Sequence, residues 1–223
     1  MDGLVVTIRR ALADAADPAK APEMQRYMKS EMPFRGVPKP ERAAVLRAVF
    51  AAHPLATPAE VVDVVSTLWR DAAYREERYA ATALLDRYAR WREPGLVPLL
   101  EELITTGAWW DHVDELASRH VGPLLRGWPD ELVPVVRAWS RHEDRWLRRT
   151  SVICQLGSKG DTDTDLLAEC VEANQDDPDF FLRKGIGWAL RQHARVDPGW
   201  VLAFVDAHPG LSPLSRREAL KHL

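Results

Sequence analysis

The sequence lacks the residue patterns that hold small secreted or metal-bound proteins together. It has only two cysteines, Cys154 and Cys170, and contains neither a Cys-x-x-Cys pair nor a His-Glu-x-x-His motif. Two thiols in helix-forming segments are typical of reduced core cysteines in a cytosolic protein. The seven histidines are scattered along the chain, so no zinc site is expected. We therefore predict that the protein uses no metal and no cofactor.

Long apolar runs are also missing. No stretch approaches eighteen consecutive apolar residues, so no transmembrane helix is expected. The N-terminal segment has no basic region and no small-residue cleavage site, which predicts no signal peptide and a cytoplasmic location. The 223 residues, of which 46% are hydrophobic and 28% charged, suffice for one large domain or an elongated array of repeats.

Signals for β-strands are absent as well. No segment alternates between apolar and polar residues, and no Asn-Gly or Asp-Gly hairpin turn occurs. Apolar residues instead recur at intervals of three and four, as in Leu4, Ile8 and Leu12. Prolines mark expected first helical turns at positions 22, 40, 58, 198 and 213, and Thr57, Asp197 and Ser212 are N-cap candidates. The expected fold is all-α, with helices over 4–15, 22–31, 40–52, 58–71, 74–91, 95–106, 109–126, 130–140, 144–156, 163–174, 179–195, 198–207 and 213–222.

Lysine is scarce. The chain has six lysines and 24 arginines, with a formal net charge of −3. The net charge argues mildly against nucleic-acid binding, although it does not determine the electrostatic field at one face. The planar guanidinium of arginine can bind a phosphate through two hydrogen bonds, which favours arginine over lysine for this role. A compositional bias of the source organism explains the ratio of arginine to lysine equally well.

A repeat of about 35 residues is visible in three similar basic segments. Arg78 and Arg149 are 71 residues apart, and Arg149 and Lys184 are 35 apart. One skipped repeat would place its equivalent residue at position 113 or 114. Antiparallel helical pairs of this period predict a HEAT-like solenoid, which we expect to form a single domain over residues 1–223. Its second helices would then bring Arg78, Asp114, Arg149 and Lys184 to one concave face; the alternative is that the cations are solvated helix-face charges.

The segment Trp109-Trp110-Asp111-His112-Val113-Asp114 is the most informative motif. Trp110 and Asp114 are four residues apart and would share a helix face. An aromatic plane beside a carboxylate suits a cationic ligand, or a sugar that becomes cationic during reaction. The alternative is ordinary structure, with the tryptophans in the core and an aspartate as a helix cap.

A second aromatic candidate lies in the last matched repeat. Trp188 follows Lys184 by four residues and precedes Arg191 by three, so the three side chains share one helix face. Gly185 and Gly187 lower helix propensity and would be tolerated where a helix or ligand approaches closely. Core packing of Trp188 remains the alternative.

These segments together resemble the AlkD-type alkylpurine DNA glycosylases of the DNA alkylation repair family. The resemblance lies in the Trp-Trp-Asp-x-Val-Asp motif and in the segments around Trp146–Arg149, Ile186–Arg191 and Pro213–Ala219. It continues to the N-terminal segments Met24–Lys29 and Gly36–Arg42, and so covers nearly the whole chain in register. Ala43 departs from the family pattern, where a second basic residue is expected, and this puts one N-terminal phosphate contact in doubt.

The resemblance implies a HEAT-like fold that grips duplex DNA in its concave face and hydrolyses the N-glycosidic bond of N3- and N7-alkylated purines. The family's acting residues map to Trp110, Asp114 and Trp188, and its DNA-contacting arginine maps to Arg149. Further candidates for DNA contact are Arg148, Lys184, Arg78, Tyr27, Lys39 and Arg191. The enzyme would act as a monomer on the bacterial nucleoid, without a pocket for a flipped base.

Elementary chemistry is compatible with that implication. An alkylated purine already carries a positive charge, so one carboxylate can stabilise the oxocarbenium-like sugar and orient water without a second acid. No lysine accompanies the motif as an obvious Schiff-base nucleophile, which predicts a monofunctional glycosylase. Two other interpretations remain open: a non-catalytic module that binds distorted or branched DNA, and a protein-binding scaffold.

Overall fold

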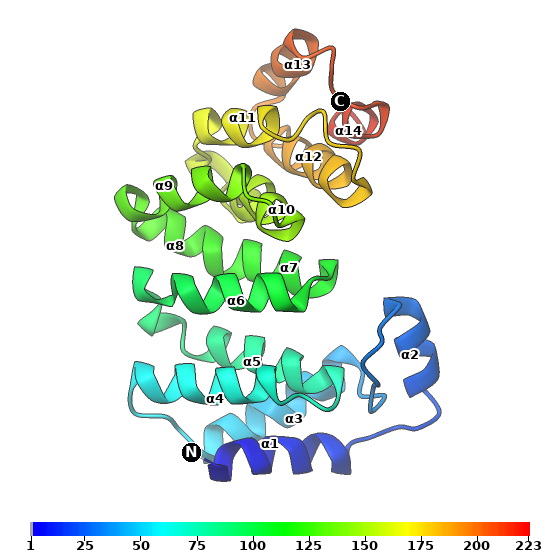
Figure 1. Cartoon of the computed structure of the whole chain (residues 1–223), viewed down its shortest axis with the longest axis vertical. Helices are drawn as coiled ribbons and strands as arrows, with labels where there is room; N and C mark the ends of the chain where they lie inside the picture. The colour runs from blue at the N-terminus through cyan, green and yellow to red at the C-terminus, as the bar shows by residue number, and fades with distance from the viewer. Residues whose placement is uncertain (1) are drawn as a thin grey trace. The chain divides into compact units, whose positions relative to one another are not determined.

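The structure is a computed structural model that describes residues 2–223, with the side chain of Asp2 left undescribed. Helices and short connections make up this part of the chain, and residues 2–223 contain no β-strand. The predicted all-α fold is thus confirmed (Figure 1). Within residues 2–223, no helix combines the length and apolar character needed to cross a membrane. The same residues contain no cluster of three or more His, Cys, Asp or Glu side chains arranged to hold a metal ion.

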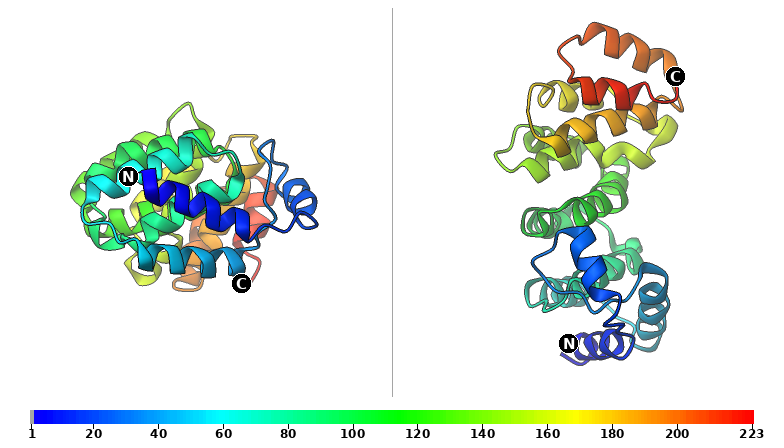
Figure 2. Two further views of the ribbon diagram at one scale, coloured as in Figure 1. Left: turned by 90° about the horizontal axis from the view of Figure 1, so that it is seen from below. Right: turned by 90° about the vertical axis from the view of Figure 1, so that its right-hand side faces the viewer.

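The chain divides into two compact units, of which the N-terminal one ends at Trp91. In this unit, α1 packs against α3, α4 and α5, and Figure 2 shows α1 and α3 side by side. Its helices are α1 (Asp2–Asp14), α2 (Ala21–Met28), α3 (Lys39–Ala52), α4 (Pro58–Arg70), α5 (Arg75–Arg87) and the 3₁₀ turn η1 (Ala89–Trp91).

The C-terminal unit runs from Arg92 to Leu223 and contains the motifs around Asp114 and Trp188. As the period predicts, α6 packs against α7 and α9 against α10, whereas α11 packs against α9 and α10, and α12 against α14. Its elements are η2 (Pro94–Leu96), α6 (Val97–Gly107), α7 (Trp110–Leu116), η3 (Ala117–Val121), α8 (Gly122–Gly127), α9 (Pro129–Ser140), α10 (Arg145–Ile153), η4 (Cys154–Gly157), η5 (Lys159–Asp161), α11 (Thr164–Glu172), α12 (Phe180–His193), α13 (Pro198–Ala207) and α14 (Pro213–Ala219).

Local sequence signals set the helix starts. Thr57, Asp197 and Ser212 each accept a backbone N–H from the first turn of the adjoining helix, as predicted. Thr57 forms a reciprocal capping box with Glu60. The five predicted first-turn prolines all lie at the first or second helical position.

The helix ends were predicted less well. The helices expected over 74–91, 144–156 and 213–222 end at Arg87, Ile153 and Ala219, and the first two continue as short 3₁₀ turns. The helix expected over 109–126 extends to Gly127, but residues 117–121 form a π turn within it. Such a turn inserts an extra residue and rotates the rest of the helix, a tertiary adjustment that a 3.6-residue pattern does not predict.

Candidate functional site

A tight corner between α6 and α7 brings the tryptophan–aspartate motif to the surface. Ala108 ends α6 in a left-handed conformation (φ 40°), and its N–H donates to the Ile104 carbonyl. Trp109 is extended, and α7 begins at Trp110. Val113 and Leu116 are fully buried. Trp110 and Asp114, which share the other face of this short helix, therefore point away from the core.

Three helices converge on a cleft of about 270 Å³ in the C-terminal unit. α10 packs against both α7 and α12, and this contact brings together segments 35 and 70 residues apart. Trp110 and Trp188 line the cleft, and both are partly exposed, in contrast to the fully buried core tryptophan Trp69. Trp110 and Trp188 thus lie at the wall of the cleft and are less buried than Trp69. The full lining is Trp110, Asp114, Arg149, Phe180, Phe181, Lys184 and Trp188.

Asp114 is held by a two-point contact with Arg149. The Arg149 Nε donates to Asp114 Oδ1 at 2.8 Å, and Nη2 donates to Oδ2 at 2.9 Å. The remaining guanidinium nitrogen, Nη1, donates to the Phe181 carbonyl on α12. A bidentate arginine–carboxylate pair fixes the plane of the carboxylate. Because each carboxylate oxygen has two lone pairs, Asp114 keeps one free position on each oxygen.

The electrostatic state of Asp114 reflects two opposing influences. Burial of the side chain raises the pKa of Asp114, and the hydrogen bonds and positive charge of Arg149 oppose this rise. Asp111 adds a smaller repulsion that also raises the pKa. The net pKa lies above the ordinary aspartate value, so Asp114 is a stronger base than a solvated carboxylate.

Arg149 was expected to contact a DNA phosphate, and in the structure its guanidinium is directed at the carboxylate of Asp114. Its side chain is only 4% exposed, and its nitrogens are directed at Asp114 and Phe181. In this structure the Arg149 guanidinium is thus engaged within the protein, at the wall of the cleft. Sequence spacing predicted the face on which Arg149 lies but could not show that a carboxylate from the preceding repeat meets it there.

Phe180 and Phe181 line the cleft but were missed in the sequence. Phe181 packs against Trp109 and Trp146 at centroid distances of 5.4 and 5.0 Å, while Phe180 is 59% exposed. The period contains a signal for them: Trp110 lies 70 residues before Phe180, and Trp146 lies 35 before Phe181. Asp144 and Asp179 cap their helices at matching positions. Trp110 and Phe180 at one repeat phase, and Phe181 at the next, thus line the cleft together.

The other predicted cations of this unit have acidic partners. Arg148 pairs with Asp177 at 2.9 Å and also donates to the His142 and Glu143 carbonyls. Lys184 Nζ lies 2.8 Å from Glu218 Oε1, and its side chain is 41% exposed. Arg191 contacts the other oxygen of Glu218. Lys184 shares the cleft with Asp114 and Arg149, as the repeat phase predicted.

Three of the predicted DNA contacts belong to the N-terminal unit. Tyr27 is 74% exposed on α2, and Lys39 is exposed at the first position of α3. Arg78 is half-buried on α5, with its guanidinium 4.9 Å from the Trp69 ring centroid. Burial and the nearby Arg75 lower the pKa of Arg78.

A buried carboxylate explains the Gly36 segment that precedes Lys39. Glu76 is fully buried and accepts the backbone N–H groups of residues 35, 36 and 37. Gly36 has φ 83°, and a Cβ there would lie 2.0 Å from the Asp17 carbonyl oxygen. Only glycine fits this turn, which sets the start of α3 and the position of Lys39.

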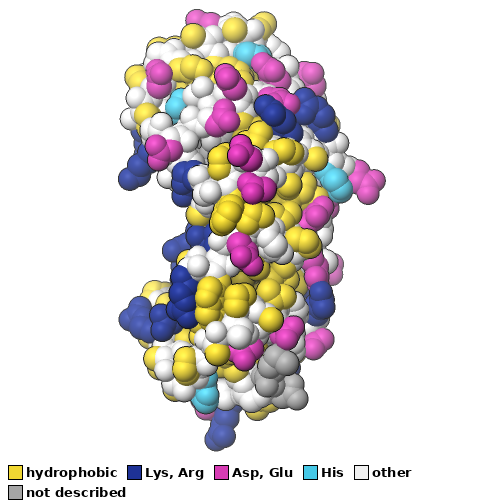
Figure 3. Space-filling model, turned by 90° about the vertical axis from the view of Figure 1, so that its left-hand side faces the viewer, with side chains coloured by type: hydrophobic (Ala, Val, Ile, Leu, Met, Phe, Trp, Pro, Cys, Tyr) yellow, Lys and Arg dark blue, Asp and Glu magenta, His cyan; other side chains and the backbone are white. Residues whose placement is uncertain are grey.

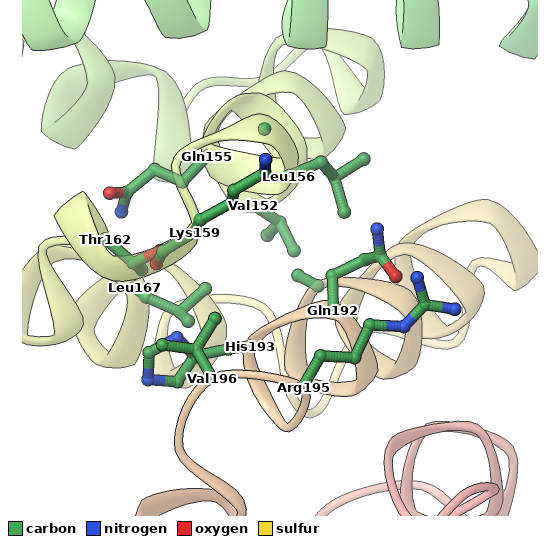
Figure 4. Close-up of a pocket in the computed structure, with 12 residues that line it drawn as sticks. Val152, Gln155, Leu156, Lys159, Thr162, Leu167, Gln192, His193, Arg195 and Val196 are labelled. Atoms are coloured by element: carbon green, nitrogen blue, oxygen red, sulfur yellow. The ribbon is translucent and has the colours of Figure 1, made fainter.

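A second hollow in the C-terminal unit has a different character. It lies between the ends of α10 and α12 and the η4–η5 segment, with Gln155, Lys159, Gln192 and His193 among its lining residues (Figure 4). Its volume of about 280 Å³ is close to that of the aromatic cleft, so size alone does not identify the site. It contains no carboxylate and none of the residues predicted from the sequence.

The face of the C-terminal unit seen in the upper part of Figure 3 mixes acidic, basic and hydrophobic side chains. A DNA-binding surface is expected to gather positive charge. The mixed surface in this view does not have that property.

Comparison with known proteins places the chain in a family. No curated protein matches the chain. The chain is similar to a solved structure, a predicted DNA alkylation repair enzyme from Enterococcus faecalis, with 30% identity and a TM-score of 0.79. This similarity covers 93% of the chain and 96% of that structure. The family model for the DNA alkylation repair enzyme matches residues 8–223. The chain therefore belongs to the DNA alkylation repair enzyme family.

Proposed function

We propose that the protein is a monofunctional, AlkD-type DNA glycosylase that releases cationic N3- and N7-alkylated purines from duplex DNA. The observation that carries this proposal is that Asp114, Trp110 and Trp188 line one aromatic cleft. The carboxylate is oriented by Arg149 and retains free lone pairs toward the cleft. Family membership supports a role in DNA alkylation repair.

The proposed reaction breaks the bond between the sugar C1′ and the purine nitrogen. The bonding electron pair leaves with the base, which becomes neutral, and positive charge develops on the deoxyribose. Asp114 stabilises this cation, and the faces of Trp110 and Trp188 favour it through their π electrons. Water then adds to C1′, and its proton passes to Asp114 and on to solvent. The products are free base and an abasic site.

Arg149 is assigned a positioning role in this mechanism. It fixes the carboxylate of Asp114 and limits the rise in its pKa. Tyr27, Lys39, Arg78, Arg148, Lys184 and Arg191 remain the proposed contacts to the DNA backbone.

Recognition by charge, without a pocket that reads the base edge, fits the composition of the cleft. Its lining consists of four aromatic side chains, one carboxylate and two cations. Reading a flipped neutral base requires hydrogen-bonding groups matched to its edge. The nitrogens of Arg149 are engaged with Asp114 and Phe181, so they are not available for this purpose.

The test is release of free base from a duplex that contains N7-methylguanine. We expect release from this duplex and from duplexes with bulky cationic adducts, but none from uracil or 8-oxoguanine duplexes, whose lesions are neutral. Single-turnover assays measure each rate. Efficient uracil excision would instead indicate a closed base pocket. Binding without release would favour a non-catalytic DNA-binding module, and no binding at all would favour a protein-binding scaffold.

Arg149→Gln should move the acid limb of the pH–rate profile to higher pH. Asp114 acts as a carboxylate, so the rate falls as pH drops through its pKa. Loss of Arg149 removes the influence that opposes the effect of burial, and the pKa of Asp114 rises further. Arg137→Gln is the matched control, because Arg137 pairs with Glu169 and not with Asp114. An unshifted acid limb in Arg149→Gln would contradict the assigned role.

A further inference from the structure

α14 lies unusually close to α12 next to the site. A Cβ at Gly187 would lie 2.5 Å from Glu218 Cβ and 2.8 Å from the Ser215 carbonyl oxygen. The Ser215 hydroxyl donates to the Arg183 carbonyl at 2.9 Å, and so attaches the two helices. Figures 1 and 2 both show α14 beside α12. Close contact at a glycine brings the carboxylate of Glu218 directly against the helix that carries Trp188.

Glu218 bridges two cations on α12. Its Oε1 lies 2.8 Å from Lys184 Nζ, and its Oε2 contacts Arg191 Nη1. The Glu218 side chain is 12% exposed, so water screens this cluster only in part. Hydrogen bonds from Lys184 and Arg191 lower the pKa of Glu218 to about 2. The carboxylate therefore stays charged at neutral pH.

The two cations are those expected to bind DNA phosphate near the cleft. Lys184 lines the cleft with Asp114 and Trp188, and its side chain is 41% exposed. Arg191 is 18% exposed on the same face, seven residues along α12. With Glu218 between them, the local charge is one positive unit instead of two. A phosphate that approaches Lys184 must compete with a carboxylate that is already in place.

We propose that Glu218 is a positioning residue that restrains Lys184 at the edge of the cleft and thereby limits the affinity of the protein for undamaged duplex DNA. The proposal rests on the proposed function, because it assumes that this face meets DNA. Weaker non-specific binding leaves the enzyme free to move along DNA, where undamaged sites far outnumber lesions.

The experiment compares Glu218→Gln with the unchanged protein in binding to an undamaged duplex across a range of salt concentrations. The variant keeps the side-chain shape and removes the charge. We expect severalfold tighter binding at low salt, and a slope of log K against log salt steeper by about one unit, as one more phosphate contact requires. A purely structural role for Glu218 would lower the melting temperature without steepening the slope.

Glu169→Gln is the matched control. Glu169 also bridges two arginines, Arg137 at 2.7 Å and Arg141 at 3.3 Å, but lies on α11, away from the cleft. The net charge changes equally in both variants, so a general effect of charge would steepen the salt slope in both. An effect that acts through Lys184 should steepen it only in Glu218→Gln. Adding Lys184→Gln to Glu218→Gln should remove most of the gain, which assigns the effect to Lys184.

Unchanged or weaker duplex binding by a folded Glu218→Gln protein would overturn the proposal. If that variant fails to fold, Glu218→Asp provides the test, since the shorter carboxylate cannot hold both cations and should show a smaller gain. Release of N7-methylguanine is measured on the same proteins. If Glu218→Gln binds the duplex more tightly but neither protein releases N7-methylguanine, the proposed glycosylase activity is rejected and the role of Glu218 is retained.

Discussion

Replacement of Asp114 by Asn should reduce release of N7-methylguanine by at least about 100-fold, the loss typical when one preorganised charge-stabilising group is removed. The variant keeps the shape of the side chain but cannot neutralise an oxocarbenium-like sugar. Duplex binding should be retained or slightly improved, because a negative charge is removed and no phosphate contact is lost. Single-turnover rates and equilibrium binding on the same duplex separate the two effects.

The partner of Asp114 provides a check on that result. Arg149 is buried and would lose its counter-charge, which can cost about 3–5 kcal/mol when a buried pair is broken. The Asn oxygen still accepts one hydrogen bond, so the loss should be smaller, and thermal unfolding will show whether the variant is folded under the assay conditions. Asp111→Asn is the matched control and should keep most activity. An active Asp114→Asn protein would move the chemistry elsewhere, with Asp111 the next candidate.

Gly187→Ala should destabilise the protein by about 1–3 kcal/mol, the usual cost of overpacking a close contact. The new methyl group would meet the backbone of Ser215 and the Cβ of Glu218, and neither can move without displacing α14. Because Trp188 and Lys184 lie on the same helix, excision should fall as well. Denaturant unfolding measures the stability change, with excision rates determined well below the unfolding midpoint.

Gly185→Ala is the comparison that isolates the helix contact. A methyl group at position 185 would lie 3.0 Å from Arg149 Nη1, the end of a side chain, and 3.4 Å from Ile153 Cγ2. Alanine also gains up to about 1 kcal/mol of helix propensity over glycine. We expect little loss of stability but reduced excision, because Arg149 would be pushed from its position on Asp114. Equal stability of the two alanine variants would contradict the close approach of α14.

Residue spacing alone predicted much of the fold and part of the site. The 3.6-residue pattern and the capping residues are local properties, so the helices and most of their starts could be predicted from them. The same local geometry predicted that Trp110 and Asp114 share a face. The repeat of about 35 residues predicted that Asp114, Arg149 and Lys184 belong to one surface, and they line one cleft. The period also places Phe180 two repeats after Trp110, although Phe180 was not among the predicted site residues.

The partners of the charged side chains depended on the tertiary structure. The sequence made Arg149, Arg148, Lys184 and Arg191 candidates for DNA contact, and the structure pairs each with a carboxylate from another repeat or helix. A difference of a few ångströms between helices decides whether an arginine meets solvent or a neighbouring aspartate, and this distance depends on packing contacts such as those of Gly185 and Gly187. Sequence therefore determined the helix faces on which Asp114, Arg149 and Lys184 lie, because helical phase sets the face, whereas only the packing of three helices decided which charges remain available to a ligand.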